Sequence, residues 1–255
     1  MDSELIDLRT AAEQMGVHYQ TAYKWVRSGK LEADLVEGRY LLRRPTVEAL
    51  LQRRAAPKRP PARQPRGGFD VLAGRMYEAL VAGDERSARK LISGLVDDAV
   101  PITTAIQDVL VPPLRRIGAE WRDGHLSIWV EHRASAIIER MLGEHHPTPR
   151  GRRRGTAMVA AMSGDHHTLP TSMAAAALRD DNWHVHHLGA DMPGDQMVQF
   201  CREIEVDLAV LTVTVPEVRD DAVDTAAQLE RDGVRTLVGR PGGTLAELQR
   251  SARAR

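Results

Sequence analysis

The pattern of apolar and polar positions divides the chain into three parts, and it is clearest in the last. From residue 156 onward, short apolar runs alternate with segments whose apolar residues recur at helical spacing. This pattern predicts strands at 156–162, 183–188, 207–214 and 234–238, and helices at about 171–180, 194–204, 220–232 and 244–252. Such alternation indicates a parallel sheet wrapped by helices, in a flavodoxin-like (Rossmann-like) domain. These sheets usually have five strands, so with four we expect the last edge to be abbreviated or covered by a partner.

The middle part, residues 69–147, has apolar residues three and four positions apart, which predicts an antiparallel four-helix bundle. We expect its helices at about 69–83, 85–98, 101–122 and 127–145. The breaks between them fall at Asp84-Glu85, at Val100-Pro101 and at Asp123-Gly124.

Residues 4–30 predict two short helices joined at Gly16. Small apolar residues line the first helix, and Trp25 supplies a buried aromatic late in the second. Glu37-Gly38 then separates two alternating runs, which predicts a hairpin, and Pro45 is expected to open a helix through Arg54. Two helices around a glycine turn, followed by a hairpin, are typical of a winged helix-turn-helix.

The polar side chains of this first part suit contact with double-stranded DNA. On the second helix, base edges in a major groove are within reach of His18, Tyr19, Gln20, Thr21 and Lys24, and Arg27 suits phosphate. The hairpin carries Arg39, Arg43 and Arg44, which would make a basic wing. Over about fifty residues the segment resembles the winged DNA-binding domain of the MerR and excisionase families. A helical hairpin used for protein contact is the alternative, and the wing and the local charge argue against it.

Charge is spread unevenly along the 255 residues, although the net formal charge is zero. Residues 1–68 hold 13 Lys and Arg against 8 Asp and Glu. A basic N-terminal segment agrees with nucleic-acid contact. Residues 55–68 contain four prolines and no acidic residue, which indicates a stiff linker, either a solvated tether or a segment touching DNA phosphates.

The length allows two or three domains. We expect a winged helix-turn-helix at 1–55, a basic Pro-rich linker at 56–68, a four-helix bundle at 69–147 and an α/β domain at 148–255. No apolar run approaches eighteen residues and no apolar signal segment follows Met1, so we expect neither a membrane span nor export, and a cytoplasmic location. With Cys201 as the only cysteine, a multi-cysteine metal site is excluded, and any metal must be held by histidine, carboxylate or a cofactor.

The stretch Ser163–Pro170, Ser-Gly-Asp-His-His-Thr-Leu-Pro, leaves the predicted strand 156–162 and precedes a helix. Open α/β sheets bind ligands beyond the carboxyl ends of their strands. Asp165 and His167 lie two residues apart, so the carboxylate can fix the imidazole tautomer and raise its basicity, as a metal-ligating histidine requires. The loop is therefore a candidate metal-binding site.

A second candidate lies at the last junction of the bundle. Trp121 is near the end of the third helix, and Ile128, Glu131 and His132 occupy the first turns of the fourth. They could face a common ligand. Taken alone, a tryptophan at a helix end is more often a core residue, and a Glu-His pair is more often a solvated face.

The spacing of these motifs resembles known sensors. Trp121, nine residues, then Glu131-His132 resembles the signature of adenosylcobalamin-binding photoreceptors of the CarH and LitR type, whose helical bundle caps the upper face of the corrin. The loop at residues 164–170 resembles the Asp-x-His-x-x-Gly loop of cobalamin-binding domains, where the histidine coordinates cobalt from below. Thr212 and Gly239 stand where that family places a serine and the first of two glycines beside the buried nucleotide tail. Pro170 and Arg240 depart from it, because both replace glycines that let backbone approach the tail.

The resemblance implies a non-enzymatic, light-responsive repressor that binds operator DNA, with adenosylcobalamin as chromophore. His167 would be the lower cobalt ligand in darkness, with Trp121 and Ile128 around the adenosyl group and Glu131 on its ribose. His132 would become a ligand after light, changing a homo-oligomer (dimer or tetramer) that forms with bound cofactor. Two alternatives stay open: a DNA-binding regulator whose α/β domain has lost its cofactor and senses a protein partner, and a corrinoid carrier for methyl transfer.

Overall fold

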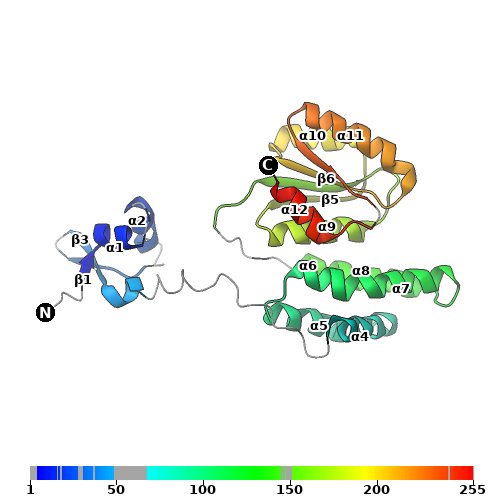
Figure 1. Ribbon diagram of the computed structural model, residues 1–255, viewed down its shortest axis with the longest axis horizontal. Coiled ribbons are helices and arrows are strands. Elements are labelled where there is room, and N and C mark those ends of the chain that lie inside the picture. Colours follow the sequence, from blue (N-terminus) through cyan, green and yellow to red (C-terminus); the bar gives the residue numbers. More distant parts are fainter. Residues whose placement is uncertain are drawn as a thin grey trace. The chain divides into compact units, whose positions relative to one another are not determined.

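The computed structural model describes residues 5–15, 17, 19–27, 31–36, 38–48, 68–144, 147, 151–240 and 242–254. The chain forms two compact units, Met1–Pro61 and Ala62–Arg255 (Figure 1). Among the sequence predictions, His18, Glu37, residues 49–54 and most of the 56–68 linker lie outside the described residues. Within the described part, no helix is long and apolar enough to cross a membrane.

The N-terminal unit is a small antiparallel sheet packed on two helices. Its elements are β1 (Leu5–Asp7), α1 (Leu8–Gln14), α2 (Tyr19–Arg27), β2 (Asp34–Val36) and β3 (Arg39–Arg43), in the strand order β1-β3-β2. Residues 44–48 are helical. The two helices and the hairpin are as predicted. The strand β1 was not predicted, because it is three residues long and is defined by pairing with β3 (Leu5 opposite Arg43), far along the chain.

Small side chains let the two helices of this unit approach closely. Ala11 and Ala22 are fully buried, as is Leu42 from β3. Asp7 caps α1 by accepting hydrogen bonds from the backbone N–H groups of Arg9 (2.8 Å) and Thr10 (3.0 Å). Trp25, predicted to be a buried aromatic, is partly buried and packs against this core.

The helical bundle consists of α4 (Gly68–Ala82), α5 (Glu85–Asp97), a long third helix and α8 (Ile128–Glu144). The third helix runs through α6 (Ile102–Ala105), a π-helical turn η1 (Ile106–Leu110) and α7 (Val111–Arg122). Pro112 and Pro113 at the start of α7 donate no N–H and crowd the preceding turn, so the wider π turn lies where an α-helix would be strained.

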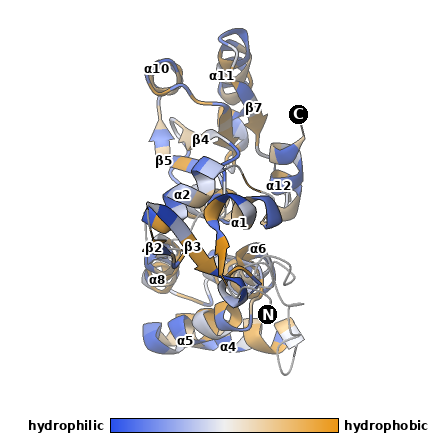
Figure 2. Cartoon of the chain, turned by 90° about the vertical axis from the view of Figure 1, so that its left-hand side faces the viewer, coloured by the Kyte–Doolittle hydropathy of each residue, from blue (hydrophilic) through white to orange (hydrophobic). Residues whose placement is uncertain are grey.

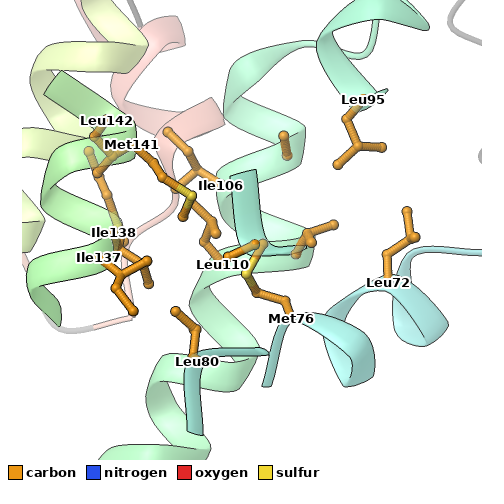
Figure 3. Packing of buried hydrophobic residues seen from close by; sticks show 14 of the residues in the cluster. Leu72, Met76, Leu80, Leu95, Ile106, Leu110, Ile137, Ile138, Met141 and Leu142 are labelled. Atoms are coloured by element: carbon orange, nitrogen blue, oxygen red, sulfur yellow. The ribbon is translucent and has the colours of Figure 1, made fainter. Parts of the chain in front are cut away.

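The bundle core is continuous and tightly enclosed (Figure 3). Figure 3 shows Met76 and Leu80 from α4, Ile106 and Leu110 from the π turn, and Ile138 from α8 converging on one another. All five are at most 1% exposed. By contrast, α5 alternates hydrophilic and hydrophobic residues along its length (Figure 2), as expected of a helix with one solvated face.

The C-terminal part is a four-stranded parallel sheet in the order β5-β4-β6-β7, with β4 (Thr156–Met162) and β6 (Leu208–Thr212) in the middle. The edges are β5 (His184–Met192) and β7 (Arg235–Val238). Every residue of β6 is buried, as expected of a parallel strand covered on both faces. The strand order and the alternation of helices confirm the predicted flavodoxin-like arrangement.

Helices cover both faces of this sheet, and one face also meets the bundle. Figure 1 shows α9 (Thr168–Asp180) and α12 (Leu245–Arg253) on the bundle side, with α10 (Gly194–Ile204) and α11 (Arg219–Arg231) on the other. Met173 and Ala176 of α9 belong to the bundle core. The hydroxyl of Ser172 donates to Glu139 Oε2 of α8 at 2.8 Å. The bundle and the α/β part are therefore packed together through α9.

Candidate functional site

The predicted loop lies at the carboxyl end of the central strand β4, as expected for a ligand site in this fold. The backbone N–H of Asp165 donates to the carbonyl of Met162 at 3.0 Å, which turns the chain sharply after the strand. Gly164 has a φ of 89°, and a Cβ there would lie 3.3 Å from Val218 Cγ1. A side chain at Gly164 would thus be strained in backbone conformation and crowded.

Asp165 is fully buried at the centre of this loop. Its carboxylate accepts hydrogen bonds from the Thr214 backbone N–H (2.8 Å), the Thr214 hydroxyl (2.6 Å to Oδ1) and the His167 backbone N–H (3.2 Å). Burial acts to raise the pKa of Asp165, but the hydrogen bonds from Thr214 and His167 outweigh it and hold the pKa below its ordinary value. The carboxylate is therefore ionised at neutral pH and acts only as a hydrogen-bond acceptor.

His167 lies with its Nδ1 2.9 Å from Asp165 Oδ1. Because the carboxylate is an acceptor and the Thr214 hydroxyl proton already points to it, Nδ1 must carry the imidazole proton. The same Nδ1 lies 2.9 Å from the Thr214 oxygen. In the neutral imidazole, Nε2 then has a free lone pair, on a side chain that is 63% exposed. In metal sites, a carboxylate commonly accepts a hydrogen bond from one ring nitrogen of a histidine. This contact orients the other nitrogen towards the metal.

A second carboxylate fixes the outer side of the loop. Asp191, near the end of β5, accepts from the Gly164 backbone N–H (2.8 Å) and the Ser163 hydroxyl (3.2 Å). Its own backbone N–H donates to the Asp165 carbonyl at 3.0 Å. The neighbouring His166 has its Nδ1 3.7 Å from Asp191 Oδ2. The two histidines of the loop are thus held by different carboxylates, and only His167 is held by a buried one.

The second predicted cluster lies at the start of α8 and is largely exposed. Glu131 Oε2 lies 2.7 Å from His132 Nδ1, and Glu131 Oε1 accepts from the Ser135 hydroxyl at 2.8 Å. The His132 side chain is 71% exposed. Trp121 at the end of α7 and Ile128 at the start of α8 are 41% and 50% exposed, which is unusual for large apolar side chains. Apolar surface and a polar pair therefore occur on the same end of the bundle.

No hydrogen bond or ion pair joins this cluster to the Asp165–His167 loop within the described residues. The connection between them is α8 itself. Glu139 of α8 contacts Ser172 of α9, and Glu131 lies eight residues earlier, about 12 Å along the helix axis. Glu131 and His132 thus lie about two helical turns along α8 from the contact between Glu139 and α9.

A cavity of about 750 Å³ opens beside the loop, where the carboxyl ends of β6 and β7 meet α9, α12 and α7. Thr212 and Gly239 both line it. A Cβ on Gly239 would lie 3.2 Å from the Leu211 carbonyl oxygen and the Val213 backbone nitrogen, so a side chain there would press on the backbone of β6. The volume is typical of ligand pockets, which span roughly 300–1,000 Å³.

The two departures from the expected glycines also line this cavity. Pro170 is the third residue of α9, a first-turn position whose N–H has no partner inside the helix, so its ring costs no hydrogen bond. The Arg240 side chain is 70% exposed and lies 3.5 Å from Glu247 Oε1. It borders the cavity mouth and does not fill the interior.

Comparisons with known proteins agree with this architecture. A family described as "B12 binding domain" matches residues 72–144, a second family with the same description matches residues 155–252, and a family described as "Helix-turn-helix domain" matches residues 5–55. The chain therefore joins a helix-turn-helix domain to a two-part B12-binding module. In this module the bundle is the helical B12 cap, and the parallel sheet belongs to the Rossmann-like B12-binding domain.

Individual proteins share only a quarter or less of their residues with this chain. The chain is 25% identical over 173 residues to the HTH-type transcriptional repressor CarH of Myxococcus xanthus, an alignment that covers 66% of this chain and 58% of that protein. In fold, it resembles the monomethylamine corrinoid protein of Methanosarcina barkeri, with a TM-score of 0.55 and 17% identity over 72% of this chain and 96% of that one. A methanol:cobalamin methyltransferase complex from the same organism matches with 16% identity over 80% of this chain and 90% of the other, at a TM-score of 0.37.

The residues of the B12-binding module fit a corrinoid in two respects. His167 offers a single oriented nitrogen, which would suit a metal that needs one protein ligand because a macrocycle supplies the others. Gly239 leaves space at the cavity wall that a Cβ would take, so the backbone of β6 and the loop after β7 can both reach a ligand in the cavity. The His167 loop and the cavity both lie at the carboxyl ends of the strands.

Three residues that contact the predicted site were not predicted. Thr214 could have been found as a polar residue just beyond a buried parallel strand. Ser135 could have been found from its position four residues after Glu131 on one helix. Asp191 carried no such signal, because β5 runs to Met192 and not to the predicted residue 188.

Apart from His18, which lies outside the described residues, the residues predicted to contact DNA are on the surface of the helix-turn-helix unit. Tyr19, Gln20, Thr21, Lys24 and Arg27 are exposed on α2, and Arg39, Arg43 and Arg44 are exposed on and just after β3. An unpredicted aromatic row accompanies them: the Tyr23 ring lies 6.4 Å from Tyr19 and 5.8 Å from Tyr40, between ring centroids. The tyrosines tie α2 to the hairpin, so both elements can present cations as one surface.

Proposed function

We propose that this protein is a DNA-binding transcriptional regulator that uses adenosylcobalamin as a light sensor and acts as a repressor in darkness. One observation carries the proposal. Asp165, buried and ionised, holds His167 so that a free imidazole nitrogen is available to cobalt, in a chain that also has a helix-turn-helix domain. The likeness to a named transcriptional repressor supports a regulatory role over an enzymatic one.

On the lower side of the cofactor, His167 is the proposed cobalt ligand. Adenosylcobalamin supplies a cobalt–carbon bond that light can break. Asp165 keeps the proton on His167 Nδ1 and makes Nε2 a better donor, while Thr214 holds Asp165 in place. Thr212 and Gly239 line the cavity proposed to receive the nucleotide tail.

On the upper side, the proposal assigns the exposed cluster of the bundle to the adenosyl group. Trp121 and Ile128 provide the apolar surface that packs against it, and Glu131 accepts a hydrogen bond from its ribose. His132 would be the second cobalt ligand after light. Because Glu131 is the side-chain partner of His132 among the described residues, and His132 is largely exposed, it can change partner without disturbing the bundle core.

The output of the switch is proposed to be oligomerisation coupled to DNA binding. A cofactor-bound dimer or tetramer carries several helix-turn-helix units, each presenting Tyr19, Gln20, Thr21, Lys24 and Arg27 to the major groove and its basic wing to phosphates. Joined units bind an operator far more tightly than one unit, through effective concentration. Loss of the oligomer would then release the DNA.

The test is to purify the full chain in darkness with adenosylcobalamin and to record its absorbance and molecular mass before and after green light. A matching duplex is first selected from a random pool with the dark protein, and binding to it is measured in both states. We expect cofactor uptake, a light-dependent spectral change, a smaller oligomer and weaker DNA binding. Absence of cofactor uptake contradicts the proposal, and uptake without a change in mass removes the oligomer step.

A second function, that of a corrinoid carrier, is proposed from the fold likeness to the monomethylamine corrinoid protein. A corrinoid carrier needs an open upper face and no operator. Tight binding of a methylated corrinoid together with failure to select any duplex would support that function. A colourless protein that still selects a duplex would instead support a regulator without cofactor, the alternative raised by Pro170 and Arg240 in place of two glycines.

A further inference from the structure

The cavity beside the cofactor loop has an apolar interior and a positively charged mouth. Its interior is formed by side chains such as Leu114, Met173 and Val210. Three arginines line it, Arg115, Arg240 and Arg250, and Glu247 is the one acidic residue among the described lining residues. A cavity of this kind complements a ligand that has an apolar ring and an anionic group.

The positive charge at the mouth is poorly compensated. Arg240 reaches Glu247 only at 3.5 Å, whereas the other oxygen of Glu247 accepts from the Thr244 backbone N–H at 3.0 Å. Within the part of the chain that the structure describes, neither Arg115 nor Arg250 forms a side-chain hydrogen bond or an ion pair, although, besides the Thr244 backbone hydrogen bond, the charge of Arg250 helps to lower the pKa of the Glu247 carboxyl group. One carboxylate thus accompanies three guanidinium groups at this mouth.

In the first turn of α12, which also borders the cavity, three backbone N–H groups already have partners. Thr244 and Glu247 form a reciprocal capping box that uses both of their backbone N–H groups. The backbone N–H of Leu245 faces Gln107 Oε1 from the π turn at 3.4 Å. The arginines are therefore the side chains that bring positive charge to this mouth.

We propose that Arg240, assisted by Arg115 and Arg250, binds the phosphate of the cofactor's nucleotide tail and so selects complete corrinoids over forms that lack it. Guanidinium groups match phosphate oxygens in geometry and charge. Arg115 comes from α7 and the other two from the α/β part, so one phosphate would join the cap to the B12-binding domain. The inference rests on the proposed cofactor function and names the part of the cofactor that Arg240 recognises.

The experiment measures dissociation constants in darkness, by absorbance titration of the full chain with three ligands. Adenosylcobalamin has the whole tail, adenosylcobinamide phosphate keeps the phosphate without the ribose and base, and adenosylcobinamide lacks all three. We expect Arg240→Gln to weaken binding of the first two about tenfold and to leave the third unchanged. Arg219→Gln, an exposed arginine at the start of α11, is the matched control and should change none of them.

Arg240→Lys separates charge from geometry and should recover part of the lost affinity, whereas a general effect on folding would not depend on the ligand. Equal losses for all three ligands in Arg240→Gln, or no loss for any, would overturn the role of Arg240 while leaving cofactor binding established. If the unchanged protein takes up none of the three corrinoids, the proposed function itself fails. The two failures are therefore distinguishable in one titration series.

Discussion

The two sides of the proposed cofactor site are built in different ways. Below, Asp165 is fully buried and receives hydrogen bonds from Thr214, which follows a different strand, so His167 is oriented by contacts between segments far apart in the chain. Above, the side-chain partners of Glu131 among the described residues are His132 and Ser135, both near it on the same helix, and the His132 side chain is largely exposed. The lower side is suited to hold a ligand in one geometry, and the upper side can rearrange at little cost.

The largest expected effect is the loss of the lower ligand. His167→Ala should weaken cobalamin binding on the order of 100-fold or more, because the cobalt loses its protein nitrogen. The absorbance spectrum of any residual complex should shift to that of a complex without histidine. His166→Ala is the matched control, since that imidazole lies in the same loop, but near the exposed Asp191. Equal spectra for the two variants would assign the ligand elsewhere.

The carboxylate behind the ligand should matter next. Asp165→Asn removes the negative charge that orients His167, and we expect roughly 10- to 100-fold weaker cofactor binding. Asp195→Asn, an exposed carboxylate in the first turn of α10, should leave the dissociation constant unchanged. An unaltered affinity in Asp165→Asn would show that the buried carboxylate serves the fold alone.

Thr214 tests whether the lower side is held by contacts between distant segments. Thr214→Val keeps the backbone hydrogen bond to Asp165 and removes the hydroxyl, so the free energy of unfolding should fall by about 1 kcal/mol and cofactor affinity several-fold. Urea denaturation and absorbance titration measure the two effects. Thr214→Ser, which restores the hydroxyl, should recover both, and a variant that fails to do so would indicate a packing effect of the methyl group.

The upper side should respond differently. His132→Ala should leave dark binding nearly unchanged and alter the spectrum and the oligomer only after light, because Glu131 keeps its contact with Ser135. The control is His125→Ala, in the exposed loop before α8. Weaker dark binding in His132→Ala would place that residue among the groups that hold the cofactor at rest and would remove the contrast between the two sides.

The smallest effect concerns acid stability of the cap. Hydrogen bonds from Arg140 and Arg89 lower the pKa of Glu85 from its ordinary 4.5 to about 2. A carboxylate with a lowered pKa stabilises the fold above pH 4.5, and this contribution is lost as the pH falls towards 2. Glu85→Gln should therefore flatten the loss of thermal stability between pH 4.5 and 2. A melting curve unchanged in its pH dependence would show that these exposed ion pairs add nothing.

Much of the fold could be predicted because the spacing of apolar residues within each short segment indicates its secondary structure. The four helical segments of the bundle and the four strands of the sheet follow apolar spacing that any short window of sequence contains. The π turn before Pro112 and Pro113 was missed, because the spacing of apolar residues there is still that of a helix. The strand β1 was missed, because three residues carry no period and their conformation depends on a partner strand.

For the site, the sequence by itself determined which groups were available: the Asp165–His167 pair at a strand end, and Trp121, Glu131 and His132 at a helix junction. Only the tertiary structure decided how they are held. In the tertiary structure Asp165 is buried and hydrogen-bonded to Thr214, and this carboxylate keeps the imidazole proton on Nδ1 of His167. The residues at the start of α8 remain exposed. Arg115 of the bundle lines the same cavity as Arg240. Burial and contacts between distant segments set hydrogen bonding and charge at a site, and neither can be read from spacing along the chain.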